Sequence, residues 1–364
     1  MTLTRTPYAL GILALTLSLS GCADTTAPGE IPARLSFRTT TGGTVGQPLA
    51  AVEVEIQDAN GNLVTSADVE VTIALDVNPG SLVMHASGAD ANDRIIELVD
   101  HTGPEVLSPF LSNNEGTEEA LGMVYDSTTG LVLSVDLDNA LNSIDPVTGA
   151  LTNIGDLGVN LKSIAFEAGA GRLIGVTAFT DSLMEVDPTA AGGTWLGRVT
   201  MGADSIEGFN GLAVDATSGT MYAVVKRRDS PNRKIRNLVT LDLTGLAATN
   251  VATFSENGVA GITFSPDGTL LAVTGDGADN PETLWSVNKA NGMMTSIIAM
   301  GNGADGEAIA AIPAQLTGLL TRPAGNGVVA FQGLAISVAA NGYTLIATAT
   351  GLTSATSAAF NIVR

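Results

Sequence analysis

The most distinctive chemistry in the chain is a basic loop between two β-patterned runs. Its six side chains are Lys226, Arg227, Arg228, Arg233, Lys234 and Arg236. They make up six of the 16 lysine and arginine residues of a chain whose formal net charge is −21. Because arginine forms bidentate hydrogen bonds with carboxylate and phosphate groups, the loop could bind an anionic glycan, a lipopolysaccharide or a protein partner. The alternative is a solvated loop whose charges only offset nearby acids, which is usual for charge runs.

A second group of polar side chains comes just before, or at the start of, several apolar runs. Its members are Glu118, Glu119, Lys162, Glu207, Asn210, Glu256, Asn257, Asp305 and Glu307. Carboxylates that converge in pairs can serve as general acid and base, as in inverting glycosidases, or hold Ca²⁺ through oxygen ligands. Glu119, Glu207 and Glu307 are the candidates for catalysis. A hydrated acidic rim is the alternative, because no dedicated glycosidase motif accompanies them.

Other ligand signals in the sequence are incomplete. His85 and His101 have no cysteine or histidine at metal-ligand spacing, which argues against a transition-metal site. Asp276, Asp279 and Asn280 lack the spacing and the closing glutamate of an EF-hand. No Walker, dinucleotide or nucleophile-elbow motif occurs. We therefore predict no metal site and no cofactor, with Ca²⁺ at the acidic residues as the one ion left open.

The composition indicates the class of protein that must position these side chains. Aromatic residues are 4% and charged residues 15% of 364, while glycine reaches 42. This profile is typical of a turn-rich all-β protein, and the length is enough for two domains with separate cores. The strongly negative net charge disfavours nucleic-acid binding, which needs a clustered positive surface for the phosphates.

The N-terminus accounts for the only cysteine. Arg5 precedes an apolar run at residues 8–19 that is too short to span a bilayer. The run ends at Leu-Ser-Gly-Cys, where the cysteine is Cys22. This pattern resembles a bacterial lipoprotein signal with its lipobox, which implies cleavage before Cys22 and a lipid on its thiol. We expect a signal peptide at 1–21, a lipidated tether at 22–31 and an extracytoplasmic location, in the periplasm or on the cell surface. The alternative is an ordinary signal peptide with an incidental cysteine.

Internal repeats organise the middle of the chain. Successive β-patterned runs end at Asp100, Asp145, Asp187, Asp242 and Asn288, which are 42 to 55 residues apart. Such a period is in the range of propeller blades. Each unit is led by two apolar runs joined by a glycine-containing turn, and these pairs begin at Gly122, Ser163, Gly211 and Gly261. Within a blade we name the four strands a to d in chain order.

One further unit is divided between the two ends of this region. Residues 308–313 match a strand a without a following partner, and residues 80–86 match a strand b without a preceding one. Joined, they complete a blade and remove two open sheet edges. Four whole units and this composite predict five blades over residues 81–313, and an open repeat stack is the alternative. The units resemble the D-P-x-T-G-containing propeller repeats of bacterial secreted and surface proteins, whose motifs mark turns and strand ends.

The flanking segments carry a sandwich pattern. Residues 51–57 alternate apolar and acidic side chains, a turn follows at 58–62, and residues 69–75 are the next strand. This stretch resembles bacterial Ig-like repeats of the invasin–intimin kind. The closing strands of such a domain match residues 327–363. We therefore expect residues 32–80 and 314–364 to be halves of one Ig-like sandwich interrupted by the propeller.

The expected fold is thus an all-β protein with a roughly five-bladed propeller inserted into an Ig-like sandwich. Insertion at an a–b turn would place the sandwich under one face of the ring and leave the b–c face, with the basic loop, free for binding. We expect a monomeric envelope lipoprotein that binds an envelope glycan or protein partner without catalysis and touches the membrane only through its lipid. A glycosidase- or lactonase-like hydrolase at the channel mouth is one alternative. A structural surface component is the other.

Overall fold

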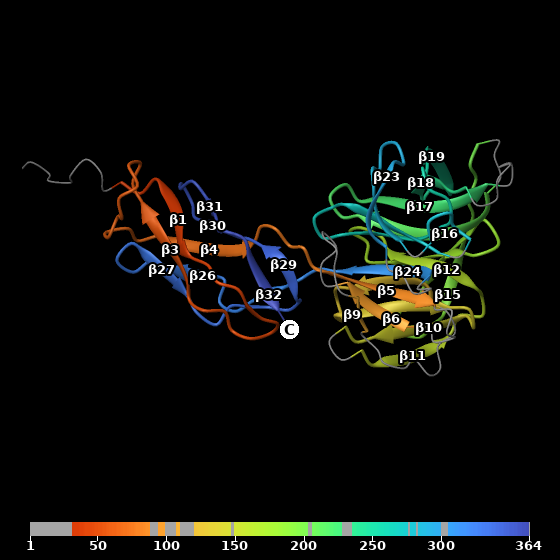
Figure 1. The fold of residues 1–364 in the computed structure, drawn as a ribbon, viewed down its shortest axis with the longest axis horizontal. Helices are drawn as coiled ribbons and strands as arrows, with labels where there is room; N and C mark the ends of the chain where they lie inside the picture. The colour runs from red at the N-terminus through yellow and green to blue at the C-terminus, as the bar shows by residue number, and fades with distance from the viewer. Residues whose placement is uncertain are drawn as a thin grey trace, which may run out of the picture.

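The computed structural model describes residues 31–87, 94–98, 107–109, 120–146, 149–202, 206–227, 235–275, 277–281, 283–299 and 305–363. Every regular element in these ranges is a β-strand, which confirms the all-β class. Figure 1 shows two groups of sheets side by side, with the chain passing from one group to the other near residue 80 and back near residue 313. Where the passages meet, Asn78 Nδ2 donates to the carbonyl oxygen of Ala314 at 2.8 Å, and the Ala314 N–H donates to Asn78 Oδ1 at 3.1 Å.

The first group of sheets is built from both ends of the chain. One sheet contains β1 (Arg34–Thr39), β3 (Val52–Gln57) and β27 (Val328–Phe331). A second contains β26 (Thr321–Pro323), β4 (Glu70–Leu75), β30 (Leu345–Thr348) and β31 (Ala355–Thr356). Smaller sheets contain β2 (Gly43–Thr44), β32 (Phe360–Val363) and β29 (Ala340–Tyr343), and β25 (Leu316–Thr317) with β28 (Ala335–Ile336). Strands from before residue 76 therefore pair directly with strands from after residue 320.

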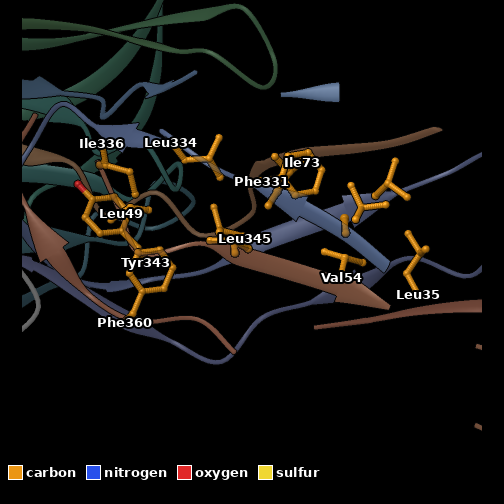
Figure 2. Packing of buried hydrophobic residues seen from close by; sticks show 14 of the residues in the cluster. Leu35, Leu49, Val54, Ile73, Phe331, Leu334, Ile336, Tyr343, Leu345 and Phe360 are labelled. Atoms are coloured by element: carbon orange, nitrogen blue, oxygen red, sulfur yellow. The ribbon is translucent and has the colours of Figure 1, made fainter. Parts of the chain in front are cut away.

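The alternating sequence of β3 explains how these sheets share a core. Val52, Val54 and Ile56 are buried while Glu53 and Glu55 stay partly exposed, because successive side chains of a strand point to opposite faces. Figure 2 shows the buried side chains of both chain ends packed together. Among them is Tyr343, whose hydroxyl donates to the carbonyl oxygen of Val338 at 2.8 Å. This bond satisfies a polar group that would otherwise be costly to bury.

The second group consists of four-stranded antiparallel sheets, five of them in the described residues. Four of these sheets use consecutive strands: β8 (Ala120–Asp126), β9 (Leu131–Asp136), β10 (Ala140–Ile144) and β11 (Leu151–Asp156); β12 (Leu161–Phe166), β13 (Leu173–Thr177), β14 (Ser182–Val186) and β15 (Gly193–Arg198); β16 (Ile206–Asp215), β17 (Thr220–Arg227), β18 (Asn237–Asp242) and β19 (Ala247–Thr253); β20 (Val259–Phe264), β21 (Leu270–Thr274), β22 (Thr283–Val287) and β23 (Met294–Ala299). The remaining sheet joins β24 (Asp305–Ile312) to β5 (Ser81–Ser87), β6 (Arg94–Leu98) and β7 (Leu107–Pro109).

The first strands of these sheets contact one another in a cycle. β8 touches β12, β12 touches β16, β16 touches β20, β20 touches β24, and β24 touches β8. Such radial repetition around an axis is the arrangement of a β-propeller and leaves few open edges. The strand that follows the repeats in the sequence, β24, thus sits beside the first strand of the first whole unit, β8.

A small residue occupies the same place in each of these first strands. The residues are Gly122, Ser163, Gly211, Gly261 and Ala308. A Cβ atom on Gly122 would lie 2.4 Å from the Cα atom of Ser163, and one on Gly261 would lie 3.0 Å from the Glu307 carbonyl oxygen. Ser163 in turn accepts a hydrogen bond on its Oγ from the Leu212 N–H at 3.0 Å. The residue at this place in each first strand is small because the backbone of the next sheet passes close to its Cα atom.

The first group of sheets, which we call the sandwich after the fold expected for these segments, lies at the a–b turn end of the ring. A cavity of about 590 Å³ between the two groups is lined by Tyr125 and Gly130 of the turn after β8 and by Thr44 and Ser337 of the sandwich. Val338 of the sandwich packs against a buried cluster of the ring that includes Ile312. Because a strand rises about 3.3 Å per residue, the other end of β8 lies roughly 17 Å away from this junction.

At the same end of the ring, an ion pair ties the third whole sheet to the fourth. Asp215 Oδ2 accepts from Lys289 Nζ at 2.5 Å, and its Oδ1 accepts from the Thr217 N–H at 2.9 Å. The Asp215 side chain is only 3% exposed. The Lys289 hydrogen bond is the main reason that the pKa of Asp215 is lowered to about 2.

We expect the free energy of unfolding of the Asp215→Asn variant to be about 1–2 kcal/mol lower than that of the wild type at pH 7, because two hydrogen bonds to a charged group are weakened. Since the pKa of Asp215 is lower in the folded state, this contribution is complete above about pH 5 and is lost as the pH falls towards 2. Urea unfolding at pH 7, 4 and 2.5 measures the difference. Asp138→Asn, at an exposed position, is the control. A difference that stayed constant down to pH 2.5 would contradict the assignment.

Candidate functional site at the mouth of the ring

A β-bulge interrupts the first strand of each sheet of the ring at an equivalent position. In every case the register shifts across the residue just before the small marker residue. The bulged residues are Leu121, Lys162, Asn210, Ala260 and Glu307. An extra residue at a bulge leaves the hydrogen-bonding ladder and its side chain is re-aimed. The five bulges lie at the strand ends away from the sandwich. We call this end of the ring the mouth.

Two of the bulged residues form an ion pair across the ring. Lys162 Nζ lies 3.1 Å from Glu307 Oε2, and the two side chains are only 13% and 11% exposed. Lys162 belongs to β12 and Glu307 to β24, and these strands are not neighbours, because β8 lies between them in the cycle. Both side chains therefore extend inward from the ring. A pair so poorly exposed depends on its geometry to offset the cost of desolvation.

Further charged groups lie beside this axial pair. Lys226 Nζ at the end of β17 lies 3.1 Å from Glu207 Oε1 of β16. Arg236, just before β18, donates from Nε to Asn210 Oδ1 at 3.2 Å. Burial lowers the pKa of Arg236, while the charge of Glu207 opposes this change. The Arg236 guanidinium is thus poorly solvated, and its hydrogen-bond acceptors include Asn210 Oδ1 and the carbonyl oxygen of Ile235.

These cations line a pocket of about 280 Å³ at the mouth. Its lining residues are Leu121, Leu137, Asn160, Lys162, Ala178, Phe179, Phe209, Asn210, Lys226 and Arg236. The wall is partly apolar, and Phe179 has 81% of its surface exposed. Asn160 donates from Nδ2 to the Leu137 carbonyl oxygen at 3.3 Å, while its Oδ1 is buried without a hydrogen-bond partner. The pocket therefore combines cationic side chains with a partly apolar wall.

The structure brings part of the basic loop and part of the acidic group into this one site. Lys226 and Arg236 line the pocket, and Arg227 is the last residue of β17. Lys162, Asn210 and Glu307 are bulged residues of the mouth. Glu207 lies next to them through its contact with Lys226. The structure does not describe the side chains of the other candidate residues from the sequence, which are Cys22, His101, Glu118, Glu119, Arg228, Arg233, Lys234, Asp276 and Asp305.

Glu256 and Asn257 hold a loop of their own sheet. Glu256 Oε2 accepts from Asn280 Nδ2 at 2.8 Å, and Asn257 Oδ1 accepts from the Asp279 N–H at 2.7 Å. Both side chains therefore support the loop between strands b and c of this sheet. His85 is fully buried in β5. No group of three or more His, Cys, Asp or Glu side chains in the described ranges is placed to hold a metal ion.

The two catalytic candidates that the structure describes are each engaged by a lysine. Glu307 contacts Lys162 and Glu207 contacts Lys226, both at 3.1 Å. In a glycosidase, by contrast, two carboxyl groups flank the bond that is cleaved, and both must exchange protons or act on the sugar. In the described mouth, both candidate carboxylates are therefore paired with a lysine.

Several residues of the mouth and its pocket lie outside the sequence-based prediction, which selects polar side chains near strand starts. Leu121 and Ala260 occupy bulges but carry no charge. The signal that identifies them is positional, since each lies one residue before the small marker of its repeat. Asn160 lies only two positions before Lys162, whereas Phe179 lies in the connection between β13 and β14 and is brought to the same pocket by the fold.

Some solved structures resemble this chain at low identity. A chain from the crystal structure of a nidogen/laminin complex is 12% identical with a TM-score of 0.44, covering 64% of this chain and 98% of that one. The PQQ-bound aldose sugar dehydrogenase of Streptomyces coelicolor is 14% identical with a TM-score of 0.37, covering 61% and 95%. The hydrazine synthase of Kuenenia stuttgartiensis is 15% identical with a TM-score of 0.34, covering 51% and 50%. No family model and no curated protein matches the chain.

In the part of the chain that the structure describes, no helix has the length and apolar character needed to cross a membrane.

Proposed function

We propose that this protein is a bacterial envelope lipoprotein whose five-bladed propeller binds an envelope ligand at the mouth, without catalysis. The observation that carries the proposal is the pocket at the mouth, where Lys162, Lys226 and Arg236 meet the exposed ring of Phe179. An exposed large aromatic side chain beside buried charge is a common feature of binding surfaces. The anchor rests on the resemblance of the segment before Cys22 to a lipobox.

The proposed architecture is an Ig-like sandwich interrupted by the propeller. It is supported by the pairing of β3 with β27 and of β4 with β26 and β30, and by a core shared between both chain ends. Five blades are supported by the cycle of contacts among the first strands and by the sheet that joins β24 to β5. In this architecture the sandwich is a spacer between the lipid and the ring.

The position of the mouth supports a binding role towards the outside. The sandwich packs at the a–b turn end of β8, beside Tyr125 and Gly130, while Leu121 of the mouth lies near the other end of the same strand. A tether that enters through the sandwich would hold the mouth away from the membrane. Ligands could then reach the mouth without displacing the anchor.

Binding to isolated envelopes tests this function. The soluble protein, residues 23–364, is sedimented with washed bacterial envelope fragments, together with a mouth variant that combines Lys226→Gln and Arg236→Gln. Because hydrogen bonds from charged groups are worth about 1.5–3 kcal/mol each, we expect the mouth variant to bind at least about tenfold more weakly. The matched control, Arg172→Gln with Arg198→Gln, removes two positive charges that do not line the pocket. Equal sedimentation of the wild type and the mouth variant would refute the proposed function.

A further inference from the structure

We propose that the cavity between the ring and the sandwich is a second binding site, which takes an uncharged sugar chain and hydrogen-bonds it to Tyr125 on one wall and Thr44 on the other. The cavity lies at the a–b turn end of the ring, whereas Lys226 and Arg236 lie at the mouth. The site is therefore separate from the mouth and does not depend on the function proposed there. Its ligand class follows from the position of the cavity, the charge of its lining and the hydroxyl groups on its walls.

The contacts that join the two groups of sheets border the cavity. The chain passes between the groups twice, and Asn78 and Ala314 exchange hydrogen bonds of 2.8 and 3.1 Å where the passages meet. Val338 of the sandwich, which lines the cavity, packs against the ring cluster that contains Ile312. At about 590 Å³ the cavity has the size of a small-molecule site, and such sites occur preferentially at domain interfaces. A ligand would thus enter a space that is already formed.

The lining of the cavity carries no charge. None of the described residues that line it is Asp, Glu, Lys, Arg or His. The Asp126 carboxylate in the adjoining turn already accepts from the Thr128 N–H at 2.8 Å and the Thr129 hydroxyl at 2.7 Å. An ion in the cavity would lose water without gaining a partner of opposite charge, which is costly. The lining therefore selects an uncharged ligand.

Residues with hydroxyl groups line both walls of the cavity. Thr44 and Ser337 belong to the sandwich, and Tyr125, Ser127 and Thr128 belong to β8 and the turn that follows it. All of these except Tyr125 are exposed, so that a ligand can reach them. A ligand that hydrogen-bonds to both walls would contact the ring and the sandwich at once.

Tyr125 supplies a donor on the ring wall. Its side chain is half-buried, and a Cβ atom on Gly130 of the same turn would lie 4.0 Å from its hydroxyl oxygen. A glycine at this position, where φ is +76°, leaves the space beside the hydroxyl open. Burial and the nearby Asp126 carboxylate raise the pKa of Tyr125, so the hydroxyl is protonated at neutral pH and can donate to a sugar oxygen.

The remaining lining suits the carbon surface of a sugar ring. Pro146, Pro313 and Val338 provide apolar surface between the hydroxyl groups. Sugar hydroxyls both donate and accept, as the hydroxyls of serine, threonine and tyrosine do, while the C–H groups of the ring can cover the apolar patches. A wholly apolar ligand would bury the hydroxyls of the walls without partners, which is unfavourable.

Titration calorimetry on residues 23–364 tests the ligand class. The uncharged probes are maltotriose, cellotriose and triacetylchitotriose, and the comparison probes are the acidic trigalacturonate and the uncharged peptide acetyl-tetraglycine amide. We expect at least one of the three uncharged trisaccharides to bind at least about tenfold more tightly than both comparison probes. Failure of all three to do so overturns the assignment.

Variants of the two walls locate the bound sugar. Tyr125→Phe removes one hydroxyl group and should weaken binding about three- to tenfold. Thr44→Phe places a ring in the cavity from the sandwich side and should weaken binding at least about tenfold. The matched controls Tyr222→Phe and Thr295→Phe lie outside the lining and should bind like the wild type. Unchanged affinity in either wall variant would show that the sugar does not bridge the two walls.

The mouth variant separates this inference from the proposed function. Lys226→Gln with Arg236→Gln should keep the full affinity for the trisaccharide, because neither residue lines the cavity. Loss of that affinity assigns the sugar to the mouth and overturns the site at the junction, whereas unchanged envelope sedimentation of the same variant refutes only the proposed function. Thermal unfolding of each variant is compared with the wild type, and Thr44→Leu replaces Thr44→Phe if the latter has lost its fold.

Discussion

Replacing Gly122 by valine will abolish or sharply lower the unfolding transition of the ring while leaving that of the sandwich in place. A Cβ atom at this position would lie 2.4 Å from the Cα atom of Ser163 and 2.8 Å from the Lys162 carbonyl oxygen. Both of these are backbone atoms, so no side-chain rotation can relieve the clash. Overpacking a core costs about 1–3 kcal/mol and sometimes more, and we expect at least about 3 kcal/mol here.

Differential scanning calorimetry of residues 23–364 measures this effect. The wild type should show one transition for each group of sheets, since the two have separate hydrophobic clusters and domains often unfold separately. The matched control is Gly192→Val, because a Cβ atom at Gly192 meets nothing within 4 Å. If Gly122→Val lowered both transitions together, the proposal that the sandwich and the ring are distinct domains would be wrong. If it lowered neither, the assigned packing of β8 on β12 would be wrong.

Breaking the axial ion pair will destabilise the ring and, at the same time, change the charge of the mouth. Lys162 and Glu307 are 13% and 11% exposed and lie 3.1 Å apart. Removing one member of a buried pair leaves the other charge uncompensated, which costs about 3–5 kcal/mol. Glu307→Gln should therefore lower the free energy of unfolding by about 3 kcal/mol, and Lys162→Met by a similar amount.

A double-mutant cycle isolates the contribution of the pair. The variant Lys162→Met/Glu307→Gln should be more stable than either single variant, because no unpaired charge is left behind. Urea unfolding followed by circular dichroism gives the three differences. Additive losses would show that the two side chains act independently and that the pair does not stabilise the ring.

The same variants report on the site. Glu307→Gln removes a negative charge from the mouth, so anionic ligands should bind more tightly even though the fold is weaker. Lys162→Met should weaken anion binding. Partial unfolding of Glu307→Gln would weaken anion binding, so a variant that is less stable and yet binds anions more tightly would show an effect of charge. Reduced anion affinity in Glu307→Gln would contradict the electrostatic assignment of the mouth.

Part of the mouth could be anticipated because strand starts in a repeat protein fall at equivalent places. Lys162, Asn210 and Glu307 were selected in this way from the sequence, and all three occupy bulges. The same reasoning selected Glu256 and Asn257, whose side chains hold a loop of their own sheet. Charge alone could not distinguish the two cases, because a bulge changes which side chain turns inward.

The sequence by itself determined the all-β class, the repeated unit and the place of its small marker residues. These follow from local causes: alternation of side chains in strands, glycine in turns and the period of the blades. Only the tertiary structure decided which side chains share the mouth. Lys162 and Glu307 are 145 positions apart, and Asn160, Phe179 and Arg236 meet at one pocket because separate sheets bring their loops to the same end of the ring. Contacts between distant segments depend on how the sheets close around an axis, and no local sequence pattern determines which segments come together.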